Sequence, residues 1–337
     1  MELFDCTLRD GGNVLGNGFP AELTTLMLHG LVDCGIRYIE YGNANGMGAG
    51  EEQGKTAPLT DAAYLALAKP LVDKARLGMF LGAGNATDER VEAAAANGLS
   101  FLRVGANAGD GDKARRAVEL VKKYKLEACY SLMKAYVLSP DALADEAARL
   151  QDMGVDMVTI MDSAGTMMPD EVSCYVEKMV RRVDIPVGFH GHNNLGLSVS
   201  NAVAAFREGA SIIDCGLMGM ARSAGNLATE IAVAVFDRLG IRTADLNSLL
   251  RFIDEKLAPA MEKHGYKPPV VPLDLVFGLA GCHSSNTAAL LEASKEFGVD
   301  VFRLTMSVSA ENRKNPSKDL IREHAHKLAA GVLATCD

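Results

Sequence analysis

The sequence has no excess of basic residues, and this absence excludes one large class of function. Its 34 Lys and Arg are outnumbered by 43 Asp and Glu, which gives a formal net charge of -9 at pH 7. Proteins that bind nucleic acid need clustered Lys and Arg to contact the phosphate backbone. No basic patch with interleaved aromatic residues occurs in the sequence. We therefore expect no nucleic-acid partner.

Long apolar runs are also missing. The first residues, MELFDCTLRDGG, carry charges at once and contain no apolar signal core. The longest apolar runs are far shorter than the roughly 20 residues that a membrane span needs. With 48% hydrophobic and 23% charged residues, the composition is typical of a soluble globular protein. We expect no membrane association and a cytoplasmic location.

Closely spaced cysteine pairs are absent as well, because none of the seven cysteines belongs to a CxxC motif. The common zinc sites use such pairs, and disulfides are rare in a reducing compartment. We therefore expect the cysteines to be small buried apolar residues rather than disulfide partners or zinc ligands.

A recurring sequence motif, called the recurring phrase below, runs through the first two thirds of the chain. Each copy is a glycine, a short β-branched or aromatic run and a closing polar residue, and the copies begin at Gly35, Gly98, Gly154 and Gly209. Further apolar runs of strand length lie at 3–6, 77–81, 128–132 and 186–189. The pattern predicts eight strands.

Helix start signals separate these runs. Pro20, Thr87 and the pair Ser139-Pro140 each precede a stretch that favours a helix, and further helices are expected from Pro169, Leu195 and Leu227. Eight strands that alternate with eight helices over residues 1–242 predict an α/β fold, a (β/α)8 TIM barrel. A doubly wound open sheet is the alternative.

After residue 242 the strand patterns stop and only helix patterns follow. Helices are expected at 245–263, 274–298 and 318–333, with an extended Pro-rich linker at 266–272. We expect residues 243–337 to form a helical C-terminal domain that covers the barrel mouth and mediates association.

The seventh predicted strand ends in VGFHGHNN. Residues two apart on a strand share a face, so His190 and His192 would point the same way. Neutral imidazole is a common ligand of divalent metals, and two on one face leave room for a third ligand and for substrate. A polar strand end with solvated histidines is the alternative interpretation.

The first predicted strand ends in DCTLRDGG. Active sites of TIM barrels lie at the carboxyl ends of the strands, so Asp10 could join His190 and His192 in a two-histidine, one-carboxylate metal site. Arg9 beside it offers a permanent cation and a fork of donors, which suit a carboxylate or a developing enolate oxygen.

Four motifs therefore stand in order at predicted strand ends: DCTLRDGG, DSAG, GFHGHNNLG and GLMGMARSAGNLATE. Together they resemble the DRE-TIM metallolyases, and within them the chain is most similar to the 4-hydroxy-2-oxovalerate aldolase branch, the class II pyruvate aldolases. The resemblance covers the barrel and continues into the C-terminal part, where FGLAGCHSS resembles the segment that lies over the mouth of the site in that branch.

The resemblance implies a bound divalent metal ion, with Mn²⁺ expected and Mg²⁺, Co²⁺ or Zn²⁺ as alternatives. The implied ligands are Asp10, His190 and His192, with Asn226 as a further ligand or a support for the others. The resemblance also implies that Arg9 stabilises the enolate of pyruvate and that Ser163 contacts the substrate keto acid.

Three positions depart from the branch. Where the branch has a His three residues after the metal Asp, taken as the base for the substrate hydroxyl, this chain has Asn13, which cannot titrate. Where the branch has a Tyr in the C-terminal segment, this chain has His283, and we predict that this imidazole takes over as a base titrating near neutrality. The loop 42–46 replaces a more acidic loop, so we expect Asn13 and Asn43 to contact a different aldehyde half of the substrate.

These features predict a carbon-carbon lyase, a metal-dependent aldolase that cleaves a 4-hydroxy-2-oxo acid to pyruvate and an aldehyde, or forms it. One alternative is an acyl-CoA-dependent Claisen condensing enzyme of the same superfamily, although such enzymes carry a Glu where this chain has Gly12. The other is a pseudoenzyme subunit of a dehydrogenase, against which the complete set of site residues argues. Expected partners are a small 2-oxo acid substrate, a second copy in a homodimer and an acylating aldehyde dehydrogenase.

Overall fold

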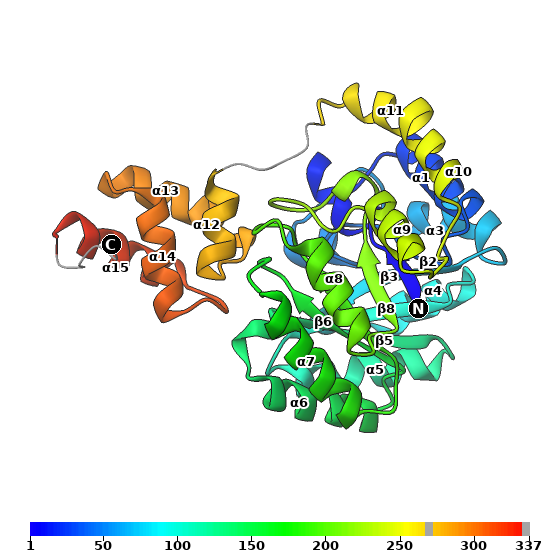
Figure 1. Cartoon of the computed structure of the whole chain (residues 1–337), viewed down its shortest axis with the longest axis horizontal. Coiled ribbons are helices and arrows are strands. Elements are labelled where there is room, and N and C mark those ends of the chain that lie inside the picture. The colour runs from blue at the N-terminus through cyan, green and yellow to red at the C-terminus, as the bar shows by residue number, and fades with distance from the viewer. Residues whose placement is uncertain (267–271, 332–337) are drawn as a thin grey trace.

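The computed structural model describes residues 1–266 and 272–331 and contains a closed barrel of eight parallel strands (Figure 1). The strands follow chain order around the barrel, and β8 pairs with β1 to close it, with Leu3 opposite Ile213. They are β1 (Glu2–Asp5), β2 (Tyr38–Glu40), β3 (Arg76–Gly82), β4 (Phe101–Asn107), β5 (Glu127–Met133), β6 (Met157–Asp162), β7 (Val187–Gly191) and β8 (Ile212–Cys215). All eight predicted strands are present, so the TIM barrel is confirmed and the open-sheet alternative is wrong.

Helices surround the barrel and begin at the predicted signals. Thr87 accepts a hydrogen bond from the backbone N–H of Arg90 at the start of α4, and Ser139 accepts one from Ala142 at the start of α6. The helices between strands and after β8 are α1 (Ala21–Asp33), α2 (Ala49–Gln53), α3 (Asp61–Ala68), α4 (Asp88–Ala96), α5 (Arg115–Lys123), α6 (Pro140–Asp152), α7 (Pro169–Arg182), α8 (Ser198–Arg207) and α9 (Thr229–Arg238). Short turns of helix precede or follow them at η1 (Asp10–Leu15), η2 (Lys69–Leu71), η3 (Ala83–Asn85), η4 (Gly111–Ala114), η5 (Ala135–Val137) and η6 (Leu217–Gly219).

The barrel interior changes from apolar to charged along its axis. Phe4, Phe101 and Ile212 belong to a small apolar cluster near the amino ends of the strands. Arg103 lies two residues further along β4 than Phe101 and faces the same side. Its guanidinium carbon stands 4.3 Å from the centre of the Phe4 ring. The buried charges therefore lie between this apolar cluster and the loops at the carboxyl ends.

Three helical segments after β8 extend the core of the barrel: α10 (Leu246–Phe252), the π-turn η7 (Ile253–Leu257) and α11 (Ala258–Glu262). Phe252 packs its ring against Gly30 of α1, where a Cβ atom would lie only 2.2 Å from the ring. Leu249, Leu257 and Met261 belong to the same buried cluster as the barrel. The helical stretch predicted at 245–263 is confirmed.

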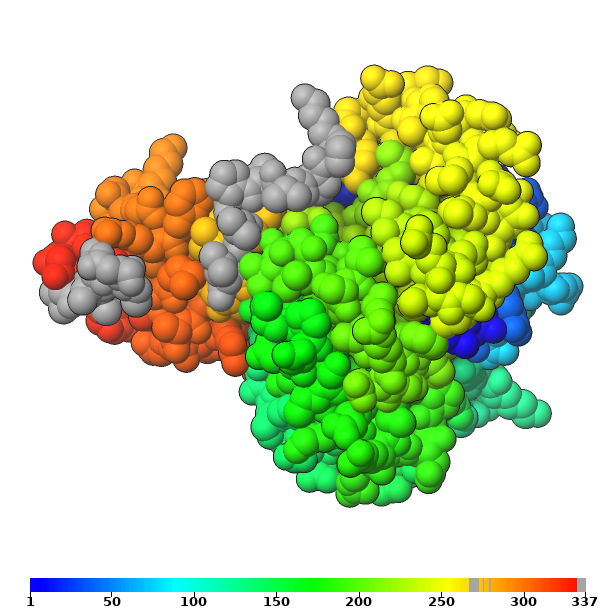
Figure 2. Space-filling view, viewed as in Figure 1, coloured from blue at the N-terminus to red at the C-terminus, as the bar shows by residue number. Residues whose placement is uncertain are grey.

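The last helices form a second lobe beside the barrel, orange to red in Figures 1 and 2. They are α12 (Pro272–Ala280), α13 (Thr287–Phe297), α14 (Val301–Glu311) and α15 (Lys318–Ala329). The lobe has its own apolar cluster, which includes Phe277, Leu290 and Ile321. It meets the barrel where the Asn194 amide donates a hydrogen bond of 2.8 Å to the carbonyl of Asp274. The domain division at residue 242 stays a prediction.

The single helix predicted at 274–298 is wrong in its middle. Gly281 takes a left-handed conformation with φ 67°, and His283 is extended, with φ -74° and ψ 137°, so α12 and α13 are separate helices. Helix α14 was not predicted, although Asp300 caps it by accepting a hydrogen bond from the N–H of Arg303. The predicted linker at 266–272 lies almost entirely outside the described residues.

The described cysteines are all free, and five of them are buried: Cys6, Cys34, Cys129, Cys215 and Cys282. Cys336 lies outside the described residues. The expectation that the cysteines are mostly buried is confirmed for the described ones. Over the same residues, no helix has both the length and the apolar character that a bilayer crossing requires.

Candidate active site

The predicted metal ligands come together at the carboxyl ends of the strands. Asp10 begins η1 directly after β1, and His190 and His192 lie at the end of β7. The Nε2 atoms of both histidines lie 3.7 Å from Oδ2 of Asp10. The three side chains are buried and could each offer one ligand atom to the same ion. The strand alternation that places His190 and His192 on one face is confirmed.

The protonation states of this cluster suit a metal ion. Burial by itself would raise the pKa of Asp10, but Arg9 and the two histidines hold that pKa well below its usual range. Burial lowers the pKa of His192 to about 4, although Asp10 opposes the shift. At neutral pH the cluster therefore offers an ionised carboxylate and a neutral imidazole, the forms that bind a metal.

His190 is held in one orientation by Asp214 of β8. Its Nδ1 atom lies 2.9 Å from Oδ2 of Asp214, and Arg103 donates two hydrogen bonds of 2.7 and 3.1 Å to the same carboxylate. Burial would raise the pKa of Asp214, but Arg103 and His190 lower it below its usual value. A charged Asp214 favours the tautomer with the proton on Nδ1, which leaves Nε2 of His190 as the ligand atom.

Arg9 is fixed by two carboxylates and keeps one donor free. Its Nε atom donates a 2.7 Å hydrogen bond to Glu40 of β2, and Nη1 lies 3.1 Å from Oδ1 of Asp10. Burial opposes the charge, but Glu40 and Asp10 together raise the pKa of Arg9 above its usual value. The Nη2 atom is buried and has no hydrogen-bond partner among the described residues. It is the donor that remains for a substrate oxygen.

Three buried charged residues of this site were missed by the sequence analysis: Glu40, Arg103 and Asp214. Arg103 Nη1 lies 3.8 Å from Oε2 of Glu40, which links the carboxylate that holds Arg9 to the one that holds His190. All three are almost completely buried. The signal was present, since each is the polar residue that closes one copy of the recurring phrase. A buried charge at the end of a strand is itself a sign of a site.

Asn226 fits the same site. Its Nδ2 atom donates a 3.0 Å hydrogen bond to Oδ2 of Asp10, while its Oδ1 atom is buried without a partner among the described residues. An orphaned amide oxygen beside a carboxylate and two imidazoles completes a set of oxygen and nitrogen ligands. Such a set suits a labile divalent ion. The residues present therefore fit the metal that the sequence predicts.

A second group, Cys6 with His190 and Asp214, could in principle hold an ion. The Cys6 thiol donates to the carbonyl of Cys215, and burial raises its pKa well above the usual value. A protonated thiol is a poor ligand, and His190 Nδ1 already contacts Asp214. The site with Asp10 is therefore the better candidate.

The residues predicted to contact the substrate differ in how far their side chains are already used in hydrogen bonds within the protein. Asn13 donates from Nδ2 to the carbonyl of Asp10 at 2.8 Å and lines a cavity at the barrel mouth. Asn43 uses both ends of its amide inside its own loop, donating to the carbonyl of Lys55 and accepting from the N–H of Asn45. Ser163, at the end of β6, accepts a 2.9 Å hydrogen bond from the N–H of Lys134 and so keeps its own hydroxyl proton free to donate.

His283 lies in the loop between α12 and α13. Its Nδ1 atom is 2.8 Å from Oγ of Ser285 and accepts a 3.2 Å hydrogen bond from the backbone N–H of Ser285. Burial, together with the nearby His192 and Arg222, lowers the pKa of His283 to about 3. Its neighbour Ser284 lines the cavity at the barrel mouth. This pKa differs from the predicted titration near neutrality, because the sequence could not show that the ring is desolvated beside Arg222.

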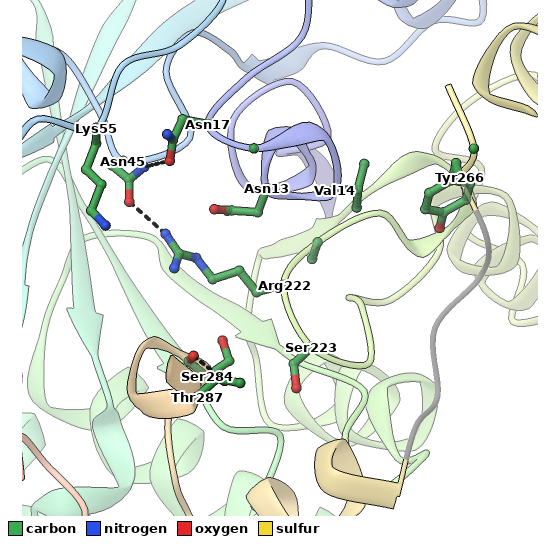
Figure 3. A pocket seen from close by; sticks show the side chains of 13 residues that line it. Asn13, Val14, Asn17, Asn45, Lys55, Arg222, Ser223, Tyr266, Ser284 and Thr287 are labelled. Atoms are coloured by element: carbon green, nitrogen blue, oxygen red, sulfur yellow. Dashed lines mark hydrogen bonds between the residues drawn. The ribbon is translucent and has the colours of Figure 1, made fainter. Parts of the chain in front are cut away.

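A cavity of about 620 Å³ opens at this mouth (Figure 3). Its walls come from the loops after β1, β2 and β8 and from the second lobe. The polar side chains around it include Asn13, Asn17, Asn45, Lys55, Arg222 and Thr287. The cavity therefore lies over the carboxyl ends of the strands, where the sequence predicts the substrate.

Known proteins are similar to the chain over nearly its whole length. The 4-hydroxy-2-oxovalerate aldolase 2 of Nocardia farcinica is 33% identical over 331 residues, which cover 98% of this chain and 94% of the relative. The 4-hydroxy-2-oxovalerate aldolase of Carboxydothermus hydrogenoformans is 32% identical, with 98% and 97% covered. These relatives confirm the predicted enzyme class, a carbon-carbon lyase.

Solved structures share the fold. The N-terminal domain of a proposed aldolase from Bacteroides vulgatus matches with a TM-score of 0.72 at 22% identity, covering 88% of this chain and 98% of that one. The carboxyl transferase domain of Rhizobium etli pyruvate carboxylase matches with a TM-score of 0.76 at 14% identity, covering 98% and 60%. A family model described as HMGL-like matches residues 1–254. With three quarters of its length matched by that model and full-length relatives above 30% identity, the chain belongs to the HMGL-like family, the DRE-TIM metallolyases.

Proposed function

We propose that the protein is a divalent-metal-dependent aldolase that cleaves a 4-hydroxy-2-oxo acid to pyruvate and an aldehyde, or runs the reverse condensation. The observation that carries the proposal is the buried cluster of Asp10, His190 and His192 with the free donor of Arg9 beside it. In cleavage the bond between C3 and C4 breaks, the C4 hydroxyl loses its proton and becomes the aldehyde. The electron pair passes to an enolate, and C3 then takes up a proton to become the methyl group of pyruvate.

Asp10, His190 and His192 would hold the metal, and the free amide oxygen of Asn226 is available as a further ligand. We propose Mn²⁺, with Mg²⁺, Co²⁺ and Zn²⁺ as the other candidates. A bound divalent ion would act as a Lewis acid toward the 2-oxo acid half of the substrate.

Arg9 stabilises the negative charge that grows on the C2 oxygen as the enolate forms. Glu40 and Asp10 occupy two of its nitrogen atoms and fix the plane of the guanidinium, so Nη2 is held ready before the reaction begins. Ser163 donates its hydroxyl proton to the keto acid, since its oxygen already accepts from Lys134.

His283 removes the proton from the C4 hydroxyl, because Asn13 cannot. In the structure Nδ1 of His283 accepts a 3.2 Å hydrogen bond from the backbone N–H of Ser285, so the neutral ring carries its proton on Nε2. The ring can act as a base through Nε2 once that proton is on Nδ1, from where it can be donated to Oγ of Ser285. Asn13 and Asn43 shape the pocket around the aldehyde half, Asn43 by holding the loop that carries Lys55.

The oligomeric state, the protein partner and the location of the enzyme are part of the same proposal. A homodimer, an acylating aldehyde dehydrogenase that receives the aldehyde, and a cytoplasmic location are all proposed from the similarity to the aldolase branch. Size measurement and co-purification from a cell extract would test the two assemblies.

The function is tested by releasing pyruvate from a panel of 4-hydroxy-2-oxo acids. Protein dialysed against EDTA should be inactive, and Mn²⁺ should restore the activity. As controls, Asp10→Asn should not respond to Mn²⁺, whereas Asp141→Asn, which changes an exposed carboxylate paired with Lys178, should respond like the wild type. Full activity in metal-free protein would overturn the proposed metal dependence, and no pyruvate from any member of the panel would overturn the proposed reaction.

A further inference from the structure

Arg222 differs from the other two arginines that are buried near the site. Arg9 and Arg103 each lie 2.7 Å from a carboxylate oxygen, of Glu40 and Asp214. Arg222 is half-buried in the loop after β8, and no carboxylate in the described parts of the chain lies within 4 Å of it. Burial and the nearby Arg9 lower its pKa, and the more distant Asp10 carboxylate only partly opposes the shift. A desolvated guanidinium of this kind is suited to an anion from outside.

The guanidinium of Arg222 is nonetheless held in place. One of its Nη atoms donates a 2.7 Å hydrogen bond to Oδ1 of Asn45, and Nδ2 of Asn45 donates to Asn17 at 2.9 Å. Figure 3 shows this chain of contacts at the edge of the cavity, with the amine of Lys55 directed toward the same space. Asn43 anchors the backbone of Lys55 through a 2.7 Å hydrogen bond. Two cations therefore converge on a cavity whose other polar walls are neutral.

Asn13 connects the wall of the cavity to the metal cluster. This residue lines the cavity and donates to both the carbonyl and the carboxylate of Asp10, at 2.8 and 3.3 Å. A substrate with its 2-oxo acid end at Asp10 and Arg9 would extend past Asn13 toward Arg222. Its aldehyde-derived end would then lie among amides and hydroxyls rather than apolar side chains.

The size of the cavity also exceeds what a small aldehyde needs. Its volume of about 620 Å³ lies in the middle of the range of pockets that hold whole metabolites, about 300 to 1,000 Å³. A two-carbon aldehyde would leave the two cations without a ligand. A longer hydroxylated chain with an anionic end would satisfy both the amides and Arg222.

We propose that Arg222 is a specificity-determining residue for an aldehyde substrate that is hydroxylated and carries an anionic group, a carboxylate or a phosphate. This inference rests on the proposed aldolase function. In condensation the methyl carbon of pyruvate loses a proton and forms a bond to the aldehyde carbon, and the aldehyde oxygen takes up a proton. The anionic group is bound by Arg222, with Lys55 nearby, and does not itself react.

The test compares acceptors that differ only in the anionic group. Condensation with pyruvate is measured for the Mn²⁺-loaded, full-length protein with glyceraldehyde 3-phosphate against glyceraldehyde, and with succinic semialdehyde against butyraldehyde. The kcat/KM should favour at least one anionic member by about 10 to 100-fold, the usual effect of a charge-assisted hydrogen bond. The pair with the larger ratio of kcat/KM values shows whether the site prefers a phosphate or a carboxylate.

Substitutions then assign that preference to Arg222. In Arg222→Gln the ratio of anionic to neutral kcat/KM should fall close to 1, and Arg222→Lys should keep part of it because the charge remains. The control Lys113→Gln, which changes a Lys with a 74% exposed side chain, should keep the full ratio. If Arg222→Gln does not fold, the proposal is still tested by the ratio of anionic to neutral kcat/KM in the wild type and by the decrease of that ratio with added salt.

Two results would overturn the inference: no preference for either anionic acceptor, or a preference that persists in Arg222→Gln. Exchange of the pyruvate methyl protons with D₂O separates this failure from that of the proposed function, since the exchange needs enolate formation but no aldehyde. A protein that exchanges these protons without discriminating among acceptors would contradict the role of Arg222 alone. A protein that does not exchange them would contradict the aldolase itself.

Discussion

His190 Nδ1 lies 2.9 Å from Oδ2 of Asp214, so a carboxylate on β8 fixes the ring of a proposed metal ligand on β7. The same carboxylate takes two hydrogen bonds from Arg103, and Arg103 reaches Glu40, which holds Arg9. The residue proposed to stabilise the enolate and the residue proposed to bind the metal are therefore joined by one buried network of charges. Substitutions at the two ends of such a network are therefore expected to have non-additive effects.

The first prediction concerns Asp214→Asn. The neutral amide no longer favours the proton on Nδ1 of His190, so the affinity for Mn²⁺ should fall by about 10 to 100-fold. The affinity is measured by titration of metal-free protein, which requires no substrate. Asp141→Asn serves as the matched control, since that carboxylate pairs with Lys178 on the exposed surface. Equal affinities in both variants would show that Asp214 does not support the metal site.

Metal binding should also stabilise the fold, because the unfolded chain does not assemble the ligands. At 100 times its Kd, Mn²⁺ is expected to add about 2.7 kcal/mol to the free energy of unfolding and to raise Tm accordingly. The increase should disappear in Asp10→Asn, which removes the ionised ligand. Thermal unfolding with and without Mn²⁺ measures the effect. An equal rise in Tm for wild type and Asp10→Asn would place the ion elsewhere.

Arg9→Lys should lower turnover by a factor on the order of 10² or more. A lysine supplies a point charge but cannot keep contacts to Glu40 and Asp10 while it donates to the enolate oxygen. Metal content should stay unchanged, which is checked by elemental analysis beside the rate of pyruvate release. Arg37→Lys, a change of an exposed arginine paired with Glu2, is the control. Near-normal turnover in Arg9→Lys would remove Arg9 from the mechanism.

The strands and the metal cluster could be predicted because both depend on local patterns. Alternation along one strand is sufficient to put His190 and His192 on the same face, and the position of Asp10 follows from the end of the first strand. The buried partners depend on geometry between strands. That Glu40, Arg103 and Asp214 meet inside the barrel follows from the register of β2, β4 and β8, which no single stretch of sequence contains.

In the loops and the second lobe, too, some features could not be predicted because they depend on the folded arrangement. The break between α12 and α13 depends on the left-handed Gly281 and the extended His283, within a stretch whose composition favours one helix. The free cation of Arg222 could not be predicted either. Its loop is part of a motif that was recognised as a whole, but only the folded arrangement shows that Glu40, Asp10 and Asp214 pair with Arg9 and Arg103 and leave Arg222 without a carboxylate.

The last prediction concerns His283 and the pH dependence of cleavage. A base acts in its deprotonated form, and a pKa lowered to about 3 leaves His283 deprotonated at every pH above about 5. A bound divalent cation nearby would lower that pKa further, so His283 stays deprotonated in the metal-loaded enzyme as well. His283→Ala should therefore reduce kcat by roughly 10² to 10⁴ and by the same factor across about pH 5 to 8. Measured profiles of the wild type and His283→Ala check this, with Ser284→Ala in the same loop as control. An acid limb near neutrality that vanishes in His283→Ala would show that the ring regains a normal pKa in the complex, and an unchanged kcat would show that it only packs.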